Sequence, residues 1–350
     1  MLSQLIKYSG IAVKTRAMSA NHLTKIDYDQ LCSMPNVTDV AVYLKNNTAY
    51  SEVFTDLNER SLHRGDIEAL LTKHFRTIVE KLYKFVNGKN KEFLIYVFLR
   101  YEIESMKIIL RCIKAGEPAR NYVETNDFFN NHLSIDLNKL AQAKSITDFI
   151  EDLRGTQYQA VLSPILSIKE RQDMFSIEMT LDMYYFKRVY ESIDKDLTGT
   201  DKQLAYHSLG SETDVLNLMW IYRSKRYYNV PKEIIYTYLT PYSYKIEKKI
   251  LTAMVEAESI EEMVTIARKT PYARLFDGLD NRFIEQNYIE FIYNLNKKML
   301  KEEPYSIASM LVYIHFTEIE IKTITNIIEG IRYGLSSDEI KSLIRIGEII

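Results

Sequence analysis

The stretch "SITDFIEDLRGTQY", from Ser145 to Tyr158, combines a helix-capping residue, an amphipathic segment and a closing Thr-x-Tyr. Two related stretches occur in the chain, "NVTDVAVYLKNNTAY" from Asn36 to Tyr50 and "SIEEMVTIARKTPY" from Ser259 to Tyr272. We call each of these stretches a box. Ser and Asn accept hydrogen bonds from the free N–H groups at a helix start, and an acid three residues later favours the first turn. Each box therefore predicts a short helix.

Each box is followed by an Ile-Glu pair that opens a segment rich in Tyr, Phe and Leu. One of these segments reads "IEMTLDMYYFKRVYESI", and its apolar spacing fits a helix better than a strand. The pairs are Ile67-Glu68, Ile177-Glu178 and Ile284-Glu285.

A third landmark is acidic. Glu102, Glu212 and Glu318 are spaced by 110 and 106 residues, and a second set of acids keeps step with them, namely Glu104, Asp214 and Glu320. We expect Glu102, Glu212 and Glu318 to be equivalent structural acids near helix starts, paired or partly buried, because buried charges persist when they are paired. A role as paired catalytic carboxylates is the alternative interpretation.

The fixed order of these landmarks, at a period near 110 residues, predicts a triplicated helical domain. We expect an N-terminal lead-in over 1–26 and helical repeats over 27–135, 136–245 and 246–350. The chain has only 11 glycines and 7 prolines among 350 residues, which favours long helices with short connections. The predicted fold class is all-α.

The bulk composition narrows the choice of partner and compartment. The formal net charge is −2, so the chain lacks the basic field that binding to nucleic acid needs. Two cysteines, Cys32 and Cys112, cannot form a disulfide framework, which favours a reducing, cytoplasmic location. The longest apolar run, Phe93–Leu99, is far shorter than the roughly 20 residues of a membrane-spanning helix.

No catalytic, nucleotide-binding or metal-binding motif is present in the sequence. It contains no phosphate-cradling glycine loop and no nucleophile elbow, and its six histidines lack metal-ligand spacing. We therefore expect a protein without catalysis, cofactor or metal. An enzyme with an unrecognised site is the alternative, and it predicts a deep pocket with titratable groups of perturbed pKa.

The stretch "YRSKRYYNV", Tyr222–Val230, mixes basic and aromatic residues. Such a mixture can form the solvated end of a helix with cations near its C-terminus, a protein-docking surface or a stacking platform for nucleic acid. The candidate protein interface comprises Arg223, Lys225, Arg226 and Tyr227.

The N-terminal stretch "YSGIAVKTRAMSANHLTKIDYDQL" resembles the opening of the C subunit of V/A-type rotary ATPases, called the d subunit in eukaryotic V-ATPases. The shared features are Tyr8, Gly10, Arg16 and Met18. The boxes and "YEIESMKIILR", with Glu102, Lys107 and Arg111, are also similar to that family, although Ser105 and Met106 stand where the family carries an Asn. The resemblance covers nearly the whole chain.

The resemblance implies three pseudo-symmetric helical domains that form a funnel around a pseudo-threefold axis. Its mouth would receive the central shaft, made of the D and F subunits, and its other end would sit on the membrane proteolipid ring. The chain would be a non-catalytic rotor component, monomeric alone and present once per complex. It would lie on the cytoplasmic side, peripheral to the membrane, with H⁺ or Na⁺ as the transported ion. A cytoplasmic helical scaffold unrelated to rotary motors is the alternative interpretation.

Overall fold

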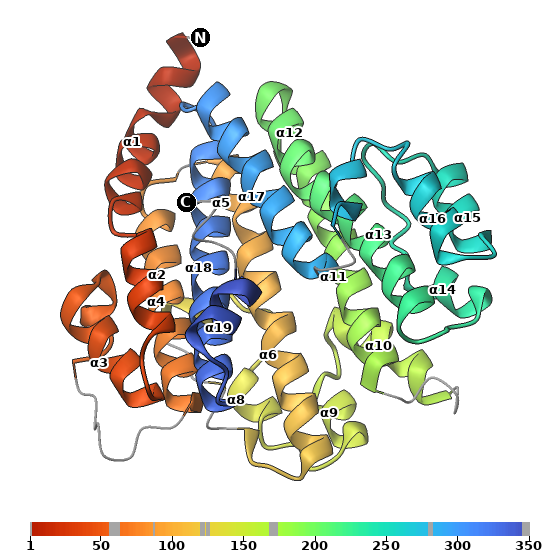
Figure 1. The fold of residues 1–350 in the computed structure, drawn as a ribbon, viewed down its shortest axis with the longest axis horizontal. Helices are drawn as coiled ribbons and strands as arrows, with labels where there is room; N and C mark the ends of the chain where they lie inside the picture. The colour runs from red at the N-terminus through yellow and green to blue at the C-terminus, as the bar shows by residue number, and fades with distance from the viewer. Residues whose placement is uncertain are drawn as a thin grey trace. The chain divides into compact units, whose positions relative to one another are not determined.

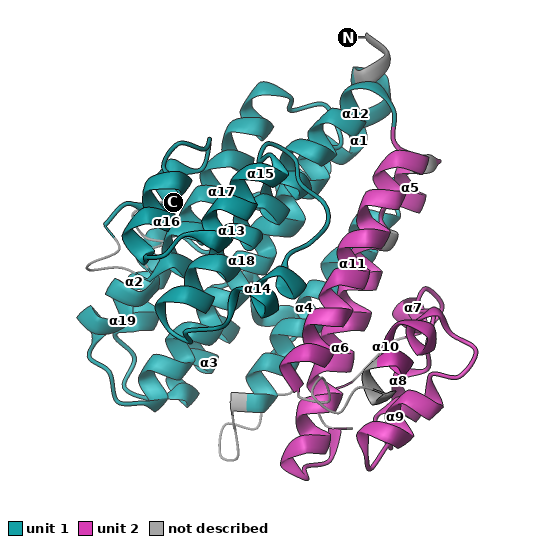
Figure 2. Cartoon of the chain, turned by 90° about the vertical axis from the view of Figure 1, so that its right-hand side faces the viewer, with its two compact units in different colours: residues 1–86, 198–350 teal, residues 87–197 magenta. Residues whose placement is uncertain are grey.

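A computed structural model describes residues 2–55, 64–86, 88–119, 123, 127–167, 174–278 and 283–344. Its regular elements within these residues are all helical, and no strand occurs among them (Figure 1). The all-α prediction is thus confirmed. The chain forms two compact units, residues 1–86 with 198–350 (unit 1) and residues 87–197 (unit 2), which are coloured separately in Figure 2. The predicted boundaries at 135/136 and 245/246 stay predictions.

Unit 1 contains the two ends of the chain. Its α-helices are α1 (Leu2–Ser19), α2 (Lys25–Cys32), α3 (Val37–Asn47), α4 (Arg64–Tyr83), α12 (Gly199–Ala205), α13 (Ser211–Arg226), α14 (Lys232–Tyr238), α15 (Lys248–Glu256), α16 (Ile260–Ala267), α17 (Ile284–Glu302), α18 (Ala308–Arg332) and α19 (Ser337–Ile344). Short 3₁₀ turns overlap the end of the first box, at Ala49–Glu52, and follow the third box, at Ala273–Phe276. A π-helical turn, Tyr206–Gly210, joins α12 to α13.

The boxes form helices for the local reason that the sequence indicates. Asn36, Ser145 and Ser259 cap α3, α9 (Ile146–Asp152) and α16, and each accepts a hydrogen bond from the backbone N–H three residues later, at 2.9, 3.0 and 3.1 Å. These bonds satisfy donors that a helix start otherwise leaves without partners. The Ile-Glu segments are also helical, in α4, α11 (Met174–Asp196) and α17.

The core of unit 1 joins the last long helix to the first box. Ile324, Ile327 and Ile328 of α18 are fully buried and belong to one apolar cluster with Leu31 of α2 and Val40 of α3. α18 is apolar around most of its circumference, as a helix covered on several sides should be. A second cluster surrounds α13, with α15, α16 and α17. α18 therefore holds the first box in place.

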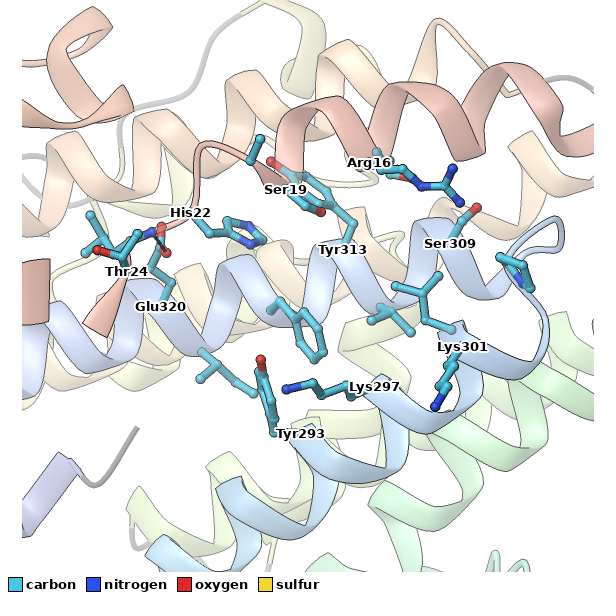
Figure 3. Close-up of a pocket in the computed structure, with 18 of the residues that line it drawn as sticks. Arg16, Ser19, His22, Thr24, Tyr293, Lys297, Lys301, Ser309, Tyr313 and Glu320 are labelled. Carbon is cyan, nitrogen blue, oxygen red and sulfur yellow. Dashed lines mark hydrogen bonds between the residues drawn. The ribbon is translucent and has the colours of Figure 1, made fainter. Parts of the chain in front are cut away.

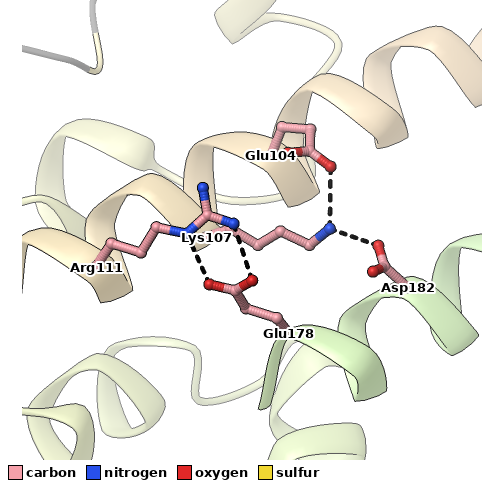
Figure 4. Close-up of polar contacts among 5 residues, drawn as sticks. All are labelled: Glu104, Lys107, Arg111, Glu178 and Asp182. Atoms are coloured by element: carbon pink, nitrogen blue, oxygen red, sulfur yellow. Dashed lines mark hydrogen bonds and ion pairs between the residues drawn. The ribbon is translucent and has the colours of Figure 1, made fainter. Parts of the chain in front are cut away.

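Unit 2 is built on two long helices, α6 (Ile95–Ala115) and α11, which pack against each other. Two charged contacts link them (Figure 4). Lys107 of α6 lies 2.5 Å from Asp182 of α11 and also 3.0 Å from Glu104 of its own helix. Arg111 of α6 donates two hydrogen bonds to the carboxylate of Glu178 of α11, at 2.7 and 2.8 Å. The other helices of unit 2 are α5 (Lys89–Phe93), α7 (Asp127–Asn130), α8 (Leu137–Leu140), α9 and α10 (Gln157–Ser167). The ammonium and guanidinium groups of α6, paired with carboxylates of α11, fix the register of the two helices.

Candidate functional site

Three buried carboxylates recur in matching surroundings along the chain. Glu320 of α18 has 5% of its surface exposed, and it accepts hydrogen bonds from the backbone N–H of Leu23 at 2.6 Å and from the Tyr50 hydroxyl at 2.8 Å. Leu23 precedes the first box, and Tyr50 closes it. Burial raises the pKa of Glu320 to about 7, against the lowering effect of these two donors. This contact joins the last long helix to the first box.

Asp214 of α13 makes the second contact of this kind. Its carboxylate accepts from the backbone N–H groups of Tyr244, Lys245 and Ile246 at 2.9, 2.7 and 3.2 Å, and from the Tyr272 hydroxyl at 2.8 Å. Tyr272 closes the third box. Asp214 is fully buried, and burial raises its pKa despite the four donors.

Glu102 of α6 makes the third contact, within unit 2. It accepts from the backbone N–H of Ser134 at 2.8 Å and from the Ser134 hydroxyl at 2.5 Å. The phenol of Tyr158, which closes the second box, lies near this carboxylate: burial and then the charge of Glu102 raise the pKa of Tyr158. The phenol oxygen itself has no partner within hydrogen-bonding geometry. Burial likewise raises the pKa of Glu102.

Glu102, Asp214 and Glu320 are therefore the acids that share one environment. The spacing of the acids along the sequence predicts Glu212 and Glu318 as the equivalents of Glu102. The residues that make the equivalent contacts lie two positions later, at Asp214 and Glu320. Glu212 is buried and accepts from the Tyr288 hydroxyl at 3.2 Å, and Glu318 lies 3.9 Å from His315. The reason is geometric: two residues along a helix turn a side chain by about 200°, away from the box.

The shared pattern has one arrangement in three places. An acid of one long helix receives a backbone N–H from the segment before a box and faces the tyrosine that ends the box. We call this set of contacts a latch. By the predicted bounds, Asp214 of the second repeat accepts from Ile246 and Tyr272 of the third, and Glu320 of the third accepts from Tyr50 of the first. Glu102 accepts from Ser134 of its own repeat and only faces Tyr158 of the second. A carboxylate in such a place acts as a structural acceptor, because a buried charge is stable only when hydrogen bonds replace its hydration.

The predicted interface residues are divided between two roles. Arg223 lies 3.2 Å from Glu285, and Lys225 donates to the backbone carbonyl of Ala257 at 2.8 Å, just past the end of α15. These two cations stabilise neighbouring helices. Arg226 and Tyr227 end α13 at the surface, where Tyr227 and Tyr228 are 49% and 64% exposed. The neighbouring helix α14, which packs against α13, also exposes Ile234 and Tyr236, and we call these two residues together with Tyr227 and Tyr228 the exposed aromatic surface.

A groove of about 860 Å³ lies within unit 1. α1, α17 and α18 form its walls (Figure 3). The floor is apolar and aromatic, and Tyr293 stacks on Phe316 with ring centroids 4.4 Å apart. At the inner end, burial lowers the pKa of His22 to about 4, so its ring is neutral and stacks on Tyr313. The sequence did not indicate this groove, because its walls come from opposite ends of the chain.

The described residues contain no cluster of His, Cys, Asp or Glu that could hold a metal ion. Among the helices that the structure describes, none is long and apolar enough to cross a bilayer.

Comparison with known proteins gives one consistent result. A family described as "ATP synthase (C/AC39) subunit" matches residues 11–343. The chain is 21% identical to the C subunit of the A-type ATP synthase of Methanocaldococcus jannaschii, over 98% of this chain and 88% of that protein. It is 22% identical to the proteins of the same name from Methanosphaera stadtmanae and Thermococcus kodakarensis, over 98% of this chain and 89% and 91% of theirs.

Proposed function

The chain belongs to the ATP synthase (C/AC39) subunit family, and we propose that it is a non-catalytic central-stalk component of a V/A-type rotary ATPase. In this role it couples the shaft, made of the D and F subunits, to the proteolipid ring of the membrane, and it turns with both. The observation that carries the proposal is the match over residues 11–343 to a family whose named relatives are ATP synthase subunits. The residues themselves add physical support.

A torque coupler has to resist deformation, and the latches supply a means. Each one ties a long helix to the segment just before a box through a buried carboxylate with at least two donors. Hydrogen bonds to a charged or polar group out of contact with water restrict motion more than exposed contacts do, because breaking them leaves a buried polar group without a partner. In unit 2, the ion pairs of Lys107 and Arg111 add to this stiffness.

A coupler also needs surfaces for its partners. The exposed aromatic surface of Tyr227, Tyr228, Ile234 and Tyr236, with Arg226 beside it, has the composition of a protein interface. Tyrosine supplies a large contact area with few rotatable bonds, and arginine supplies charge that water holds weakly. We assign this surface to one partner of the complex, and binding measured to the shaft and to the ring separately identifies which one.

The absence of catalysis in this proposal follows from what nucleotide chemistry requires. Phosphoryl transfer needs a loop that cradles phosphates and carboxylates that hold Mg²⁺. The sequence has no such loop. The three latch acids are occupied as acceptors, so they are poorly placed to bind a metal or to move protons. The purified chain should therefore hydrolyse no ATP.

A bridging assay tests the proposal with purified parts. Immobilised proteolipid ring is mixed with a D–F shaft, with and without this chain. We expect the shaft to be retained only when the chain is present. Reversing the charge of Arg226 should weaken retention and reduce its dependence on salt, because an attraction to an opposite charge across the interface would be lost. Retention of the shaft by the ring alone would contradict the proposed coupling role.

A further inference from the structure

The groove of unit 1 is a surface that neither the latches nor the exposed aromatic surface explains. Its lining residues recur with helical spacing on three walls: Ala12, Thr15, Arg16 and Ser19 on α1, Ser309–Glu320 on α18, and Tyr293–Lys301 on α17. At 1.5 Å per residue, these faces run for about 10–16 Å, which is two to three helical turns. The groove is therefore elongated along the helices that form it.

The arrangement of the walls suits a helix. α1 and α17 both pack against α18, and Figure 3 shows α18 between them with the groove above its surface. An α-helix with its side chains is about 10 Å across, and a fourth helix laid over three packed helices gives a bundle-like arrangement. Leu300, Phe316 and Tyr293 are partly exposed and supply apolar contacts along the groove, as in other grooves that bind amphipathic helices.

The charges around the groove have one sign. Arg16, Lys25, Lys297 and Lys301 line it, and Glu320 is the only carboxylate among its described lining residues. Glu320 is engaged by Leu23 and Tyr50 and is almost fully buried, so it does not neutralise the rim. Arg16, Lys25 and Lys301 are exposed, and within the described part of the chain they make no ion pair. A partner with acidic flanks would complement these charges.

One buried polar group also faces this region. Tyr28 lines the groove with 2% of its surface exposed, and its hydroxyl has no hydrogen-bond partner among the described residues. A buried hydroxyl without a partner costs free energy, and because less than 1 Å² of this oxygen is exposed, a bound molecule reaches it only if the groove lining moves.

We infer that this groove binds an amphipathic helix of a partner protein, with the helix's apolar face on Leu300 and Phe316 and its acidic flanks beside Arg16 and Lys301. The inference deepens the proposed coupling role, on which it rests for the identity of the biological partner. The binding itself is a property of the isolated chain, so it can fail while the coupling role stands.

The test uses the full chain and a fluorescent peptide of about 14 residues, long enough for two to three turns of contact. The peptide has leucines at i, i+3, i+4 and i+7 and glutamates on its flanks, and a control peptide has lysines in place of the glutamates. We expect the acidic peptide to bind at least about 10-fold more tightly in fluorescence anisotropy, with affinity that falls as salt rises.

Three variants locate the binding. Arg16→Glu combined with Lys301→Glu should lower the affinity for the acidic peptide at least about 10-fold and raise the affinity for the basic peptide. Lys248→Glu combined with Lys269→Glu makes the same change of net charge on exposed residues outside the groove lining, and should leave both affinities unchanged. Ser19→Trp, at an exposed wall position, should block both peptides by filling the groove.

Several outcomes would overturn the inference. One is equal affinity for the two peptides. Another is an affinity for the acidic peptide that the Arg16 and Lys301 substitutions leave unchanged. A third is the absence of peptide binding together with binding to vesicles of anionic lipid that depends on the same two cations, which would assign the groove to a lipid. In any of these cases, a chain that still bridges shaft and ring would leave the coupling role intact.

Discussion

Replacing Glu320 by glutamine should abolish the loss of stability that this one carboxyl causes as pH rises from about 5 to about 8. Glu320 is buried in the latch of α18, and burial raises its pKa from 4.5 to about 7. A carboxyl whose pKa is higher in the folded than in the unfolded state stabilises the fold when it is protonated. Its contribution is complete below about pH 4.5 and is lost as pH passes through about 7.

The size of this effect follows from the pKa difference. About 2.5 pKa units at 1.36 kcal/mol each give about 3.4 kcal/mol over the full range, of which about 2.5 kcal/mol falls between pH 5 and pH 8. The groups facing Glu320 do not cancel it: the phenols of Tyr28 and Tyr50 have raised pKa values and stay neutral, and Asp27 raises the pKa of Glu320 further. His22 and His74, with pKa values that burial lowers from 6.5 to about 4, are protonated at pH 5 only in the unfolded chain, so they make stability rise with pH and oppose the effect of Glu320 in the wild type. They act equally in Glu320→Gln, so the difference between the two proteins isolates Glu320.

The assay is urea unfolding at several pH values for the wild type, Glu320→Gln and Glu233→Gln. Glu233 is exposed in the first turn of α14, so its substitution removes a carboxylate without changing a buried one. We expect the difference in unfolding free energy between wild type and Glu320→Gln to change by about 2.5 kcal/mol across this range. Parallel curves for the wild type and Glu320→Gln would refute the reasoning, whatever the constant offset between them.

Three further substitutions test other contacts. Tyr272→Phe removes one donor from the buried Asp214 and should lower the free energy of unfolding in urea by about 1–2 kcal/mol. An unchanged free energy would show that the phenol adds nothing to that latch. Ser145→Ala removes the cap of α9 and should cost about 1 kcal/mol, which a thermal melt would register as a lower midpoint. Gly330→Ala would bring a Cβ to 2.7 Å from Ile340 and should cost about 1–3 kcal/mol, whereas Gly10→Ala, with no atom within 4 Å, should not destabilise α1 in the same melt.

The box helices could be predicted from the sequence because capping is local. Asn36, Ser145 and Ser259 need only the backbone three residues ahead, so the pattern in the chain carries the whole cause. The all-α class follows similarly from apolar spacing and scarce breakers. These features depend on short-range physics that one sequence records directly.

The register of the latch acids could not be predicted in this way. Glu212 and Asp214, like Glu318 and Glu320, lie two residues apart, and both sets keep nearly the same spacing along the chain. Which acid of each pair makes the contact depends on which side chain faces the box. The backbone donors that decide this lie 32, 30 and 297 residues away in sequence from Glu102, Asp214 and Glu320. The tyrosine that ends each box can be recognised in the sequence, but the carboxylate that it faces cannot.

The basic residues of α13 show a similar limit. Their clustering in the sequence is real, but Arg223 and Lys225 are engaged by Glu285 and by the end of α15, from segments further along the chain. Arg226, Tyr227 and Tyr228 remain exposed, and their role as an interface stays a prediction. The groove was invisible for the same reason, since α1 and α17 are brought together through α18.

ATP-driven ion uptake in reconstituted vesicles tests the coupling role most directly. Vesicles carrying the proteolipid ring and its membrane partners are combined with the catalytic head and shaft, with and without this chain. We expect ATP hydrolysis by the head in both samples, because the proposed role places the chemistry outside this chain. Ion uptake should occur only when the chain is present, because it is the proposed connection between shaft and ring. Full ion uptake without the chain would contradict that role and would favour a scaffold unrelated to torque transmission.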